Sequence, residues 1–475
     1  MRLLIDLQGM QNSSRDRGIG RYIGALARGV LRNSVDCDVR LVLSDLFPER
    51  IEEIIASFAG LAEPEQFHIF SGVGPTAALH DPNRWRSMAS QRIYEKFISD
   101  LAPDALLIGT LFEGGADNTV VSVGPADRPY VVATILYDLI PLLNPSEHIA
   151  SAGARRWYFD KVAQGRQADL LLGISASACR EGIEHLPSDE NHVVEIGAAA
   201  AEEFATIDLT ALHRSELTRD VLNYHGITRP FLMHASALDP RKNFEGLIEA
   251  FARLPQELRS AHQLVLVCKL NLAGQARLQN QIARYGLDED DVILTGFVPD
   301  DELRVLYANC ALFVFPSFHE GFGLPVLEAM WCGAPAVGSS LSSVPEVIGL
   351  EEALFNPNDM DDMVKVIGRG LCDTQFRTRL LDHAVRHVRN FSWDEVAKRA
   401  LAAIKSKLSK SRLSLNADDQ SMARLISELA AIKSWPGPSD TDLMSAARAL
   451  DRNECQRWSI PDFHSSLIPS TESLC

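Results

Sequence analysis

Short apolar runs alternate with amphipathic stretches along most of the chain. In the first half, the apolar runs predict strands at Leu3–Leu7, Val39–Leu43, Ala105–Gly109, Tyr130–Leu136 and Leu170–Ile174. After the first of these, apolar residues recur on one helical face from about Gly20 to about Leu31, which predicts a helix. Strands separated by such helices are typical of βαβ units and a parallel sheet.

A second series of the same kind begins at PFLMHAS. Its predicted strands are Phe231–His234, Gln263–Cys268, Val292–Thr295, Ala311–Phe315 and Ala336–Gly338. The helices expected between them are Asn243–Arg253, Gln275–Tyr285, Asp301–Ala308 and Leu324–Cys332. Two successive series predict an α/β protein with two Rossmann-like, doubly wound domains, whose ligands bind beyond the carboxyl ends of the strands.

These patterns divide the chain into three parts. We expect an N-terminal domain over residues 1–205 and a C-terminal domain over 206–389, with a helix at about 390–405 that crosses back onto the first domain. Residues 411–475 predict a small helical extension, either a linker or a docking hairpin. Its second helix has a capping-box-like start, Ser439 with Asp442.

Composition narrows the functional class. The 475 residues are 46% hydrophobic and 23% charged, as in an ordinary globular protein, and the formal net charge of −17 argues against a nucleic-acid partner. The eight cysteines form no Cys-x-x-Cys pair, which favours buried free thiols over a metal site. Since no run of about 18 apolar residues occurs, we expect a cytoplasmic protein, and peripheral association with the inner face of the membrane stays open.

The most informative stretch is FVFPSFHEGFGLPVLEAMW, which predicts a strand, a glycine-rich loop and a helix. Glu320 and Glu328 stand eight positions apart, before and within that helix. A carboxylate accepts hydrogen bonds from vicinal hydroxyls well, and a sugar nucleotide carries such hydroxyls on both hexose and ribose. Gly321 and Gly323 leave room for backbone amides to face a diphosphate at a helix N-terminus. The alternative is a glycine-rich turn with two solvated glutamates.

A basic pair follows the first strand of the second series. Arg241 and Lys242, in HASALDPRKN, are expected at the carboxyl end of that strand, where they open a helix. Two cations there would stabilise the charge on a departing β-phosphate. The alternative is a solvated basic pair.

A glycine-containing loop follows the first strand of the chain. In QGMQNSSRDRGIGRY, Gly18 and Gly20 can bring backbone amides close to a phosphate, and Arg15, Arg17 and Arg21 lie nearby in sequence. A single G-x-G is weak evidence, so an ordinary βα loop is an equal alternative.

Taken together, several motifs resemble the GT-B fold, family 4 glycosyltransferases. They are HEGFGLPVLEAMWCGAPAV, DPRKN, LTGFVPDDELRVLYANCALFVFPS and FSWDEVAKR. The N-terminal LLIDLQGMQNSSRDRGIGRY and ILYDLIPLLNP are similar to the subgroup that builds bacterial O-antigen and polymannose chains. The resemblance covers roughly residues 1–405 and is most specific over 290–350.

The resemblance implies a retaining transfer with neither metal nor cofactor, and an activated sugar bound between the two domains. By it, Glu320 contacts the donor hexose, Glu328 the ribose, and Arg241 and Lys242 the diphosphate. The loop from Gly18 to Gly20 closes over the phosphates. The implied contacts of the base are the backbone at Gly296, Phe297 and Val298. The other implied donor contacts lie in the glycine-rich loop: His319, Gly321, Phe322, Gly323 and Leu324. For His319, a structural role is the alternative.

Two positions depart from the family pattern. Many relatives carry an arginine where this chain has Ser236, so Arg241, or Lys269 at the end of the next strand, is expected to take over that work. Many also carry a histidine where this chain has Tyr137. Asp138 is then the nearest polar candidate to orient the incoming hydroxyl, unless it is only a loop carboxylate or a helix cap.

The resulting hypothesis is a mannosyltransferase that moves mannose from GDP-mannose onto a lipid-linked bacterial glycan such as O-antigen. Rhamnosyl or other hexosyl transfer from another nucleotide sugar is an alternative. So is a sugar-nucleotide epimerase of the same fold. A third is a non-catalytic nucleotide-sugar-binding module of a polysaccharide assembly complex, with a further catalytic module or assembly partner reached through the tail.

Overall fold

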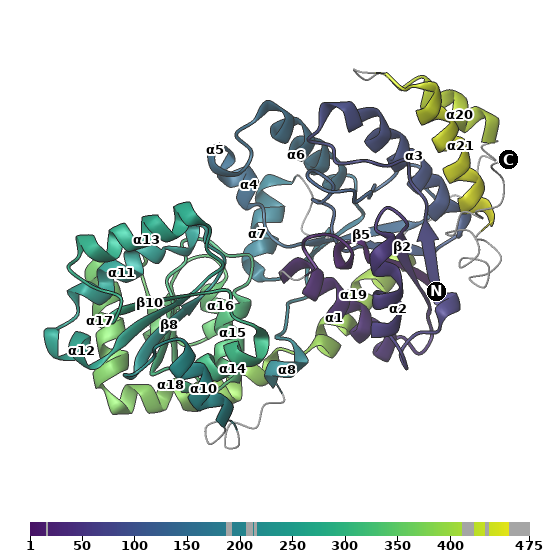
Figure 1. The fold of residues 1–475 in the computed structure, drawn as a ribbon. Coiled ribbons are helices and arrows are strands. Elements are labelled where there is room, and N and C mark those ends of the chain that lie inside the picture. Colours follow the sequence, from purple (N-terminus) through teal and green to yellow (C-terminus); the bar gives the residue numbers. More distant parts are fainter. Residues whose placement is uncertain are drawn as a thin grey trace. The chain divides into compact units, whose positions relative to one another are not determined.

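The computed structural model describes residues 1–15, 18–186, 192–205, 212, 216–410, 422–432 and 437–455. These residues form two compact units, shown in Figure 1. Unit 1 comprises residues 1–173, 179–196 and 393–475, and unit 2 comprises 174–178 and 197–392. Each unit is built on its own parallel sheet, so the prediction of two Rossmann-like α/β domains is confirmed.

The sheet of unit 1 has the strand order β3-β2-β1-β4-β5-β6-β7, and every neighbouring pair is parallel. Its strands are β1 (Arg2–Asp6), β2 (Asp38–Ser44), β3 (Phe67–Phe70), β4 (Ala105–Ile108), β5 (Val131–Leu136), β6 (Leu170–Gly173) and β7 (Val193–Glu195). β3 and β7, which the hydrophobic pattern did not predict, are the two edge strands. The topological switch point lies at β1, because β2 and β4 flank it.

Helices surround this sheet. Those of unit 1 are α1 (Gly18–Asn33), α2 (Ile51–Ser57), α3 (Arg84–Asp100), α4 (Ile140–Leu143), α5 (Pro145–His148), α6 (Ala152–Gly165), α19 (Trp393–Lys410), α20 (Met422–Ala430) and α21 (Asp440–Cys455); α7 (Ala176–His185) has its first turn in unit 2. α19, the helix expected to return to the first domain, packs along α1. Gly29 makes this approach possible, since a Cβ there would lie 2.7 Å from the Trp393 carbonyl oxygen.

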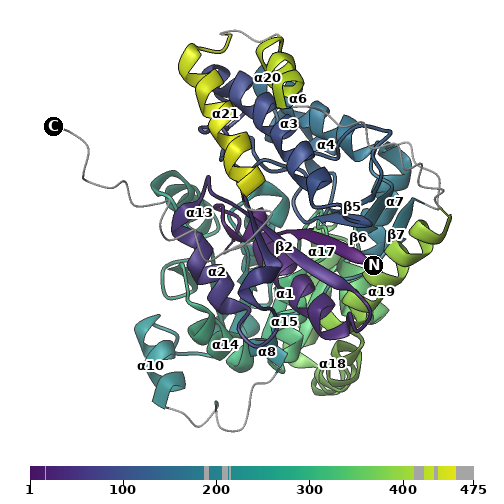
Figure 2. The ribbon, with the colours of Figure 1, turned by 90° about the vertical axis from the view of Figure 1, so that its right-hand side faces the viewer.

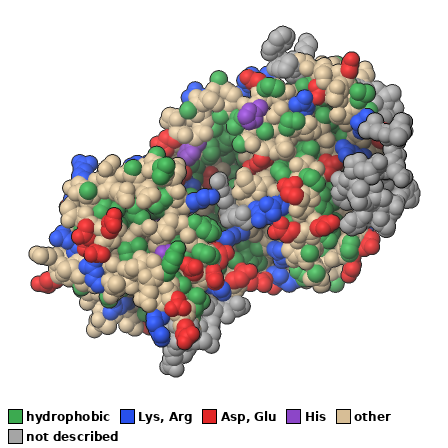
Figure 3. All heavy atoms as spheres, in the orientation of Figure 1, with side chains coloured by type: hydrophobic (Ala, Val, Ile, Leu, Met, Phe, Trp, Pro, Cys, Tyr) green, Lys and Arg blue, Asp and Glu red, His purple; other side chains and the backbone are tan. Residues whose placement is uncertain are grey.

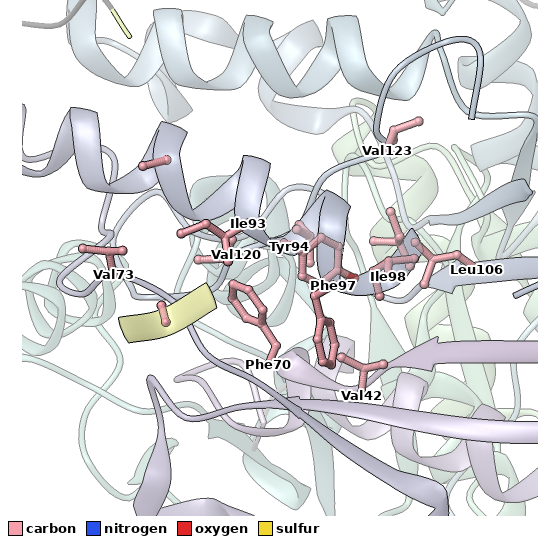
Figure 4. Close-up of a cluster of buried hydrophobic side chains, with 14 of the residues drawn as sticks. Val42, Phe70, Val73, Ile93, Tyr94, Phe97, Ile98, Leu106, Val120 and Val123 are labelled. Carbon is pink, nitrogen blue, oxygen red and sulfur yellow. The ribbon is translucent and has the colours of Figure 1, made fainter. Parts of the chain in front are cut away.

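The helical extension is part of the core of unit 1. Figures 1 and 2 show α20 and α21, in yellow, alongside α3. Ala446, Ala449 and Leu450 of α21 are buried in a cluster with residues of β1–β5 and α3, and Figure 4 shows part of that cluster around Phe70 and Tyr94. The predicted capping box is present: the Ser439 hydroxyl accepts from the Asp442 amide, and the Asp442 carboxylate accepts from the Ser439 amide.

The sheet of unit 2 has the order β10-β9-β8-β11-β12-β13 and is also parallel. Its strands are β8 (Phe231–Ala235), β9 (Gln263–Val267), β10 (Val292–Gly296), β11 (Leu312–Phe315), β12 (Ala336–Ser339) and β13 (Leu354–Phe355), the last of which was not predicted. Its helices are α8 (Glu202–Ala205), α10 (Glu216–Tyr224), α11 (Phe244–Arg253), α12 (Gln256–Ala261), α13 (Leu272–Arg284), α14 (Asp300–Asn309), α15 (Leu324–Trp331), α16 (Val344–Ile348), α17 (Met360–Cys372) and α18 (Thr374–His387).

The order of these strands places the predicted motifs together. β8 has β9 on one side and β11 on the other, so the switch point of this sheet lies between β8 and β11. The DPRKN motif directly follows β8, and the glycine-rich loop directly follows β11. Both therefore lie at the ligand-binding edge of the same crevice.

The surface carries no dominant basic stripe on the face drawn in Figure 3, where Lys and Arg side chains are interspersed with Asp and Glu. Among the described helices, none combines the length and the apolar content needed to cross a bilayer. Six cysteines in the described residues are free thiols, and four of these, Cys179, Cys268, Cys310 and Cys332, are buried.

Candidate functional site: two loops of unit 2 that share one carboxylate

The loop after β8 is shaped by local capping. Asp239 accepts a hydrogen bond from the Arg241 amide at 3.0 Å and starts a short 3-10 turn over Pro240–Lys242. Asn243 ends that turn in the left-handed conformation, with φ 57°, and α11 begins directly after it. This sharp change of direction leaves Arg241 and Lys242 adjacent at the carboxyl edge of the sheet.

The same loop is joined to the one that follows β11. The Asn243 side chain donates to the Pro316 carbonyl at 3.2 Å, and the Phe318 amide donates to the Arg241 carbonyl at 2.8 Å. The basic pair and the glycine-rich loop thus form one hydrogen-bonded structure, although they are nearly 80 residues apart in sequence.

At its centre, the Glu320 carboxylate binds both cations. Lys242 Nζ lies 2.5 and 2.6 Å from the two Glu320 oxygens, and Arg241 Nη1 lies 3.2 Å from one of them. Arg241 also donates to the His319 carbonyl at 3.0 Å and contacts Asp239 at 3.3 Å. Lys242 and Glu320 are only 7% and 6% exposed, so this is a buried ion pair with a partly exposed third member.

The electrostatics of this group follow from its burial. Burial by itself would raise the pKa of Glu320, but the charges of Lys242 and Arg241 outweigh it, and the net pKa lies below the ordinary value. Glu320 is therefore a carboxylate at neutral pH. A buried charge needs such partners, because an unpaired one costs several kcal/mol or more.

Three serine hydroxyls hold the backbone of the glycine-rich loop. The Ser343 hydroxyl lies within hydrogen-bonding distance of the Glu320 and Phe322 carbonyls, at 2.9 and 2.7 Å. Ser342, at φ 53°, accepts from the Glu320 amide at 2.9 Å, and Ser175 donates to the Gly321 carbonyl at 2.7 Å. A non-glycine residue with positive φ costs energy, and at Ser342 this conformation brings the hydroxyl to the loop.

The second glutamate of the motif lies in α15. Gly323, at φ 114°, is the residue before the helix, and Leu324 is its first residue. Glu328 is half-buried and accepts a hydrogen bond from the Tyr307 hydroxyl of α14 at 3.4 Å. Tyr307 is 1% exposed, so its position is fixed by packing.

The remaining predicted donor contacts of unit 2 end three strands of the same sheet. Ser236 follows β8, and its hydroxyl is 2.8 Å from Nε2 of the buried His234. Lys269 follows β9 and is exposed. Gly296 ends β10 with φ 76°, Phe297 after it is 73% exposed, and Val298 is buried. An exposed aromatic side chain next to an accessible backbone is suited to a flat, partly apolar group such as a base.

The predicted residues of unit 1 have local partners. Gly20 lies in the first turn of α1 and its amide donates to the Ser14 carbonyl at 3.1 Å. A Cβ at Gly20 would lie 2.3 Å from the Arg15 Cα, so packing alone requires glycine there. Gly18 is the first residue of α1, with Arg21 in the same turn, and Arg17 lies outside the described residues.

Asp138 accepts a hydrogen bond at 3.1 Å from the amide of Ile140, the first residue of α4, and Leu139 stands between them at the start of that helix. Tyr137, which stands where relatives carry histidine, packs edge-on against Tyr22, with ring centroids 5.3 Å apart. The roles expected for Asp138, Gly18 and Gly20 toward a substrate remain predictions.

Sequence reasoning missed several residues of this site. Ser175, Ser342, Ser343 and Tyr307 hold the two glutamates, and Asp239 holds Arg241. Only Asp239 carried a local signal, since an Asp before Pro is a common turn and cap start. The others lie far from the glutamates in sequence or in segments without a motif.

Similarity to known proteins covers the part of the chain that holds the two loops. The model of the family "Glycosyl transferases group 1" matches residues 224–386, which span both loops. The serotype-specific mannosyltransferase WbdA of Escherichia coli is 37% identical over 459 residues, which are 96% of this chain but 54% of that protein. The O-antigen chain mannosyltransferase B of Escherichia coli is 35% identical over 37% of this chain and 45% of its own length. The chain thus spans about half the length of the curated relatives it matches.

Solved structures share the fold at lower identity. The HepE protein of Anabaena, in complex with UDP and glucose, has a TM-score of 0.59 at 18% identity, and the match covers 86% of this chain and all of that one. WaaG, a glycosyltransferase involved in lipopolysaccharide biosynthesis, has a TM-score of 0.57 at 14% identity, over 85% of this chain and 99% of that one. The two Rossmann-like units therefore have the GT-B fold of these solved structures, and the part of the chain that holds Arg241, Lys242, Glu320 and Glu328 is similar to the group 1 glycosyltransferases.

Proposed function

We propose that the protein transfers a hexose, mannose from GDP-mannose, onto a hydroxyl of a growing lipid-linked bacterial glycan such as O-antigen. The observation that supports it most is the buried group of Glu320, Lys242 and Arg241 at the switch point of the unit 2 sheet. In this group one acid, proposed to accept from sugar hydroxyls, lies beside two cations, proposed to bind a diphosphate. The choice of mannose rests on the similarity to the mannosyltransferases above.

In the proposed reaction, the bond between the sugar C1 and the β-phosphate oxygen breaks, and its electron pair stays with the diphosphate. Lys242 and Arg241 stabilise that added charge, in a buried site where such interactions are strong. The acceptor hydroxyl oxygen forms the new bond to C1 on the same face, and its proton passes to the departing phosphate. The protein's part is to hold the reactants close and correctly oriented on that face.

Glu320 and Glu328 hold the two ends of the donor in this proposal. Glu320 accepts hydrogen bonds from hexose hydroxyls, and Glu328, fixed by Tyr307, accepts them from ribose. The backbone at Gly296 and the exposed ring of Phe297 provide a place for the base, and Lys269 or Arg241 does the work of the arginine that Ser236 replaces.

A nucleotide-sugar panel tests the proposal. GDP-mannose, GDP- and dTDP-rhamnose and UDP-glucose are each incubated with the chain, with and without a mannose-terminated acceptor, and products are followed by mass spectrometry and by NMR of the anomeric proton. We expect mannose transfer with retained configuration, only when acceptor is present. Transfer of rhamnose or glucose instead would overturn the donor assignment.

Two further outcomes would overturn the activity itself. Nucleotide release and sugar epimerisation without acceptor would make the protein an epimerase. Thermal stabilisation by a nucleotide sugar, without transfer or release, would make it a binding module. Glu320→Gln serves as the site variant, because it keeps the shape of the side chain, and the exposed Glu351→Gln of unit 2 serves as its control.

A further inference from the structure

Unit 1 carries a cavity that no part of the proposed donor site uses. Its volume is about 540 Å³, and it is lined by Gly72, Val73, Gly74, Ser445, Arg448, Asp451 and Arg452. The first three residues follow β3, and the other four are on α21. The cavity therefore opens at the carboxyl end of a parallel strand, the edge where such sheets bind ligands, and its size is in the range of small-molecule sites.

The helix that forms one wall is firmly docked. Asn453 of α21 is 7% exposed and binds Ser71 through both ends of its amide: it accepts from the Ser71 amide at 2.7 Å and donates to the Ser71 carbonyl at 3.1 Å. Asp442 pairs with Arg86 of α3 at 2.6 Å. The spacing between α21 and the glycine segment is thus fixed by buried contacts.

The opposite wall is a glycine segment in which Gly72 is buried and Gly74 is exposed. Gly72 and Gly74 both pack against Leu46, so close that a Cβ at either position would lie 2.9 to 3.0 Å from that side chain. The Gly72 amide donates to the Asp45 carboxylate at 3.4 Å and the Val73 amide to the Ser90 hydroxyl at 2.8 Å, so the exposed Gly74 is the residue whose peptide groups can face a ligand. Peptide groups both donate and accept hydrogen bonds.

The charges around the cavity alternate in sign. Arg448 and Arg452 are one helical turn apart, and Asp451 stands between them in sequence. Arg452 contacts Asp45 at 3.5 Å, and the Asp45 carboxylate also accepts from the Ser71 hydroxyl at 2.7 Å. Arg448 is exposed and has no ion-pair partner within the part of the chain that the structure describes. An anion would meet Asp451 as well as the arginines, whereas a ligand with many hydroxyls can use donors and acceptors together.

We propose that this cavity binds a segment of a neutral, polyhydroxylated glycan, as a second glycan site of unit 1. Arg448 donates to sugar oxygens, Asp451 accepts from vicinal hydroxyls, and the backbone of the exposed Gly74 supplies the facing contacts. The proposal rests on the proposed function in one respect, since a protein that extends a glycan has such a chain at hand. Held there, a long acceptor gains contacts that a short one cannot reach.

Binding is measured on the full chain by NMR or calorimetry, with short and long α-mannose oligosaccharides, maltooligosaccharides and inorganic phosphate as probes. Arg448→Ala combined with Asp451→Ala removes one cation and one anion from exposed positions of α21. The control, Glu395→Ala with Lys398→Ala, removes an equally exposed pair from α19. We expect the affinity of the cavity variant for long mannose oligosaccharides to be about tenfold lower. The control and Glu320→Gln should bind them with the affinity of the unmodified chain.

Unchanged glycan binding in the cavity variant would overturn the proposal. Two results with the unmodified chain would also overturn it: binding of phosphate without any glycan, and no glycan binding at all. Circular dichroism confirms that each variant is folded. The two proposals fail separately: absence of transfer with glycan binding that depends on Arg448 and Asp451 contradicts only the proposed function, and normal transfer with no such dependence contradicts only this inference.

Discussion

Lys242 Nζ is within 2.6 Å of both carboxylate oxygens of Glu320, and the two side chains are buried together. The cation proposed to bind the diphosphate and the acid proposed to bind the sugar therefore neutralise one another. When a diphosphate takes up part of the Lys242 charge, Glu320 becomes free to accept from hexose hydroxyls. Donor binding and preparation of the acid would then be one event.

The pair predicts a strong energetic coupling. Lys242→Ala leaves a buried carboxylate with Arg241 as its remaining cation, and should lower the free energy of unfolding by about 3–5 kcal/mol. Glu320→Ala should cost a similar amount, because it leaves Lys242 buried. The double variant should cost clearly less than the sum, as denaturant titration of all four proteins would measure. Additive losses would mean that the contact contributes no coupling.

The same variant tests the chemistry. Lys242→Ala should reduce kcat by about 10²–10³, the usual loss when a group that stabilises developing charge is removed. Lys365→Ala, at an exposed position of α17 in the same unit, is the comparison. If the two changes reduce kcat equally, the assignment of the leaving-group cation to Lys242 is wrong.

Tyr307 should act through Glu328. Its hydroxyl donates to that carboxylate at 3.4 Å, so Tyr307→Phe removes one weak hydrogen bond and no volume. We expect KM for the donor to rise about three- to tenfold, with kcat unchanged, since ribose lies away from the breaking bond. Tyr224→Phe, at an 83% exposed side chain, should change neither constant. A fall in kcat alone would contradict a role in donor binding.

Ser343 should stabilise the loop that carries Glu320. The fully buried hydroxyl contacts two loop carbonyls, and Ser343→Ala leaves these polar groups without that partner. The free energy of unfolding should fall by about 1–3 kcal/mol, and kcat should fall with it because Glu320 is less well held. Ser340→Ala, at an exposed serine three positions earlier, is the control. Equal effects of both changes would remove Ser343 from the site.

His234 makes unit 2 sensitive to acid. Burial lowers its pKa to about 4, against an unfolded value near 6.5, despite the hydrogen bond with the Val314 carbonyl. The neutral ring is favoured in the folded state, so this contribution is complete above pH 6.5 and is lost as the pH falls toward 4. The loss should reach about 3 kcal/mol.

Denaturant titrations between pH 7 and pH 4 measure this effect. His234→Asn should be less stable at neutral pH but should show a flatter fall with acid. The exposed His80→Asn variant should lose stability with acid as the unmodified chain does. Burial also lowers the pKa of His68 to about 4, but His68 is present in all three proteins and contributes equally to each curve. Parallel curves for His234→Asn and the unmodified chain would refute the assignment.

The hydrophobic pattern was sufficient to predict most of the strands and helices. It failed for β7 and β13, whose three and two residues are too few to show a pattern, and for β3, whose four-residue run FHIF is interrupted by His68. These are also edge or near-edge strands, whose pairing is decided by the rest of the sheet. The C-terminal extension was predicted to be helical. No local feature of its sequence predicts that it packs against Trp85 and Phe70.

For the site, the residue types at the strand ends indicated candidate ligand-binding side chains, but the sequence did not show which of these side chains contact one another. Glu320 and Lys242 were each assigned to a ligand, and their contact with one another could not be foreseen, since two loops 78 residues apart must first be brought together by β8 and β11. Gly20 shows a second limit: the close approach of the Arg15 backbone is by itself a sufficient reason for glycine there, so the residue type alone does not identify a phosphate loop.

The docking of α21 has a practical consequence for anyone who shortens this chain. A boundary placed after α19 would leave the first 410 residues with both complete sheets, yet it would uncover the apolar side chains of α3 and β3 that Ala446, Ala449 and Leu450 now cover. It would also remove the Asn453 side-chain amide, which forms hydrogen bonds with the Ser71 backbone amide and carbonyl. We expect such a fragment to aggregate on expression, whereas one that ends after Cys455 should stay monodisperse in gel filtration.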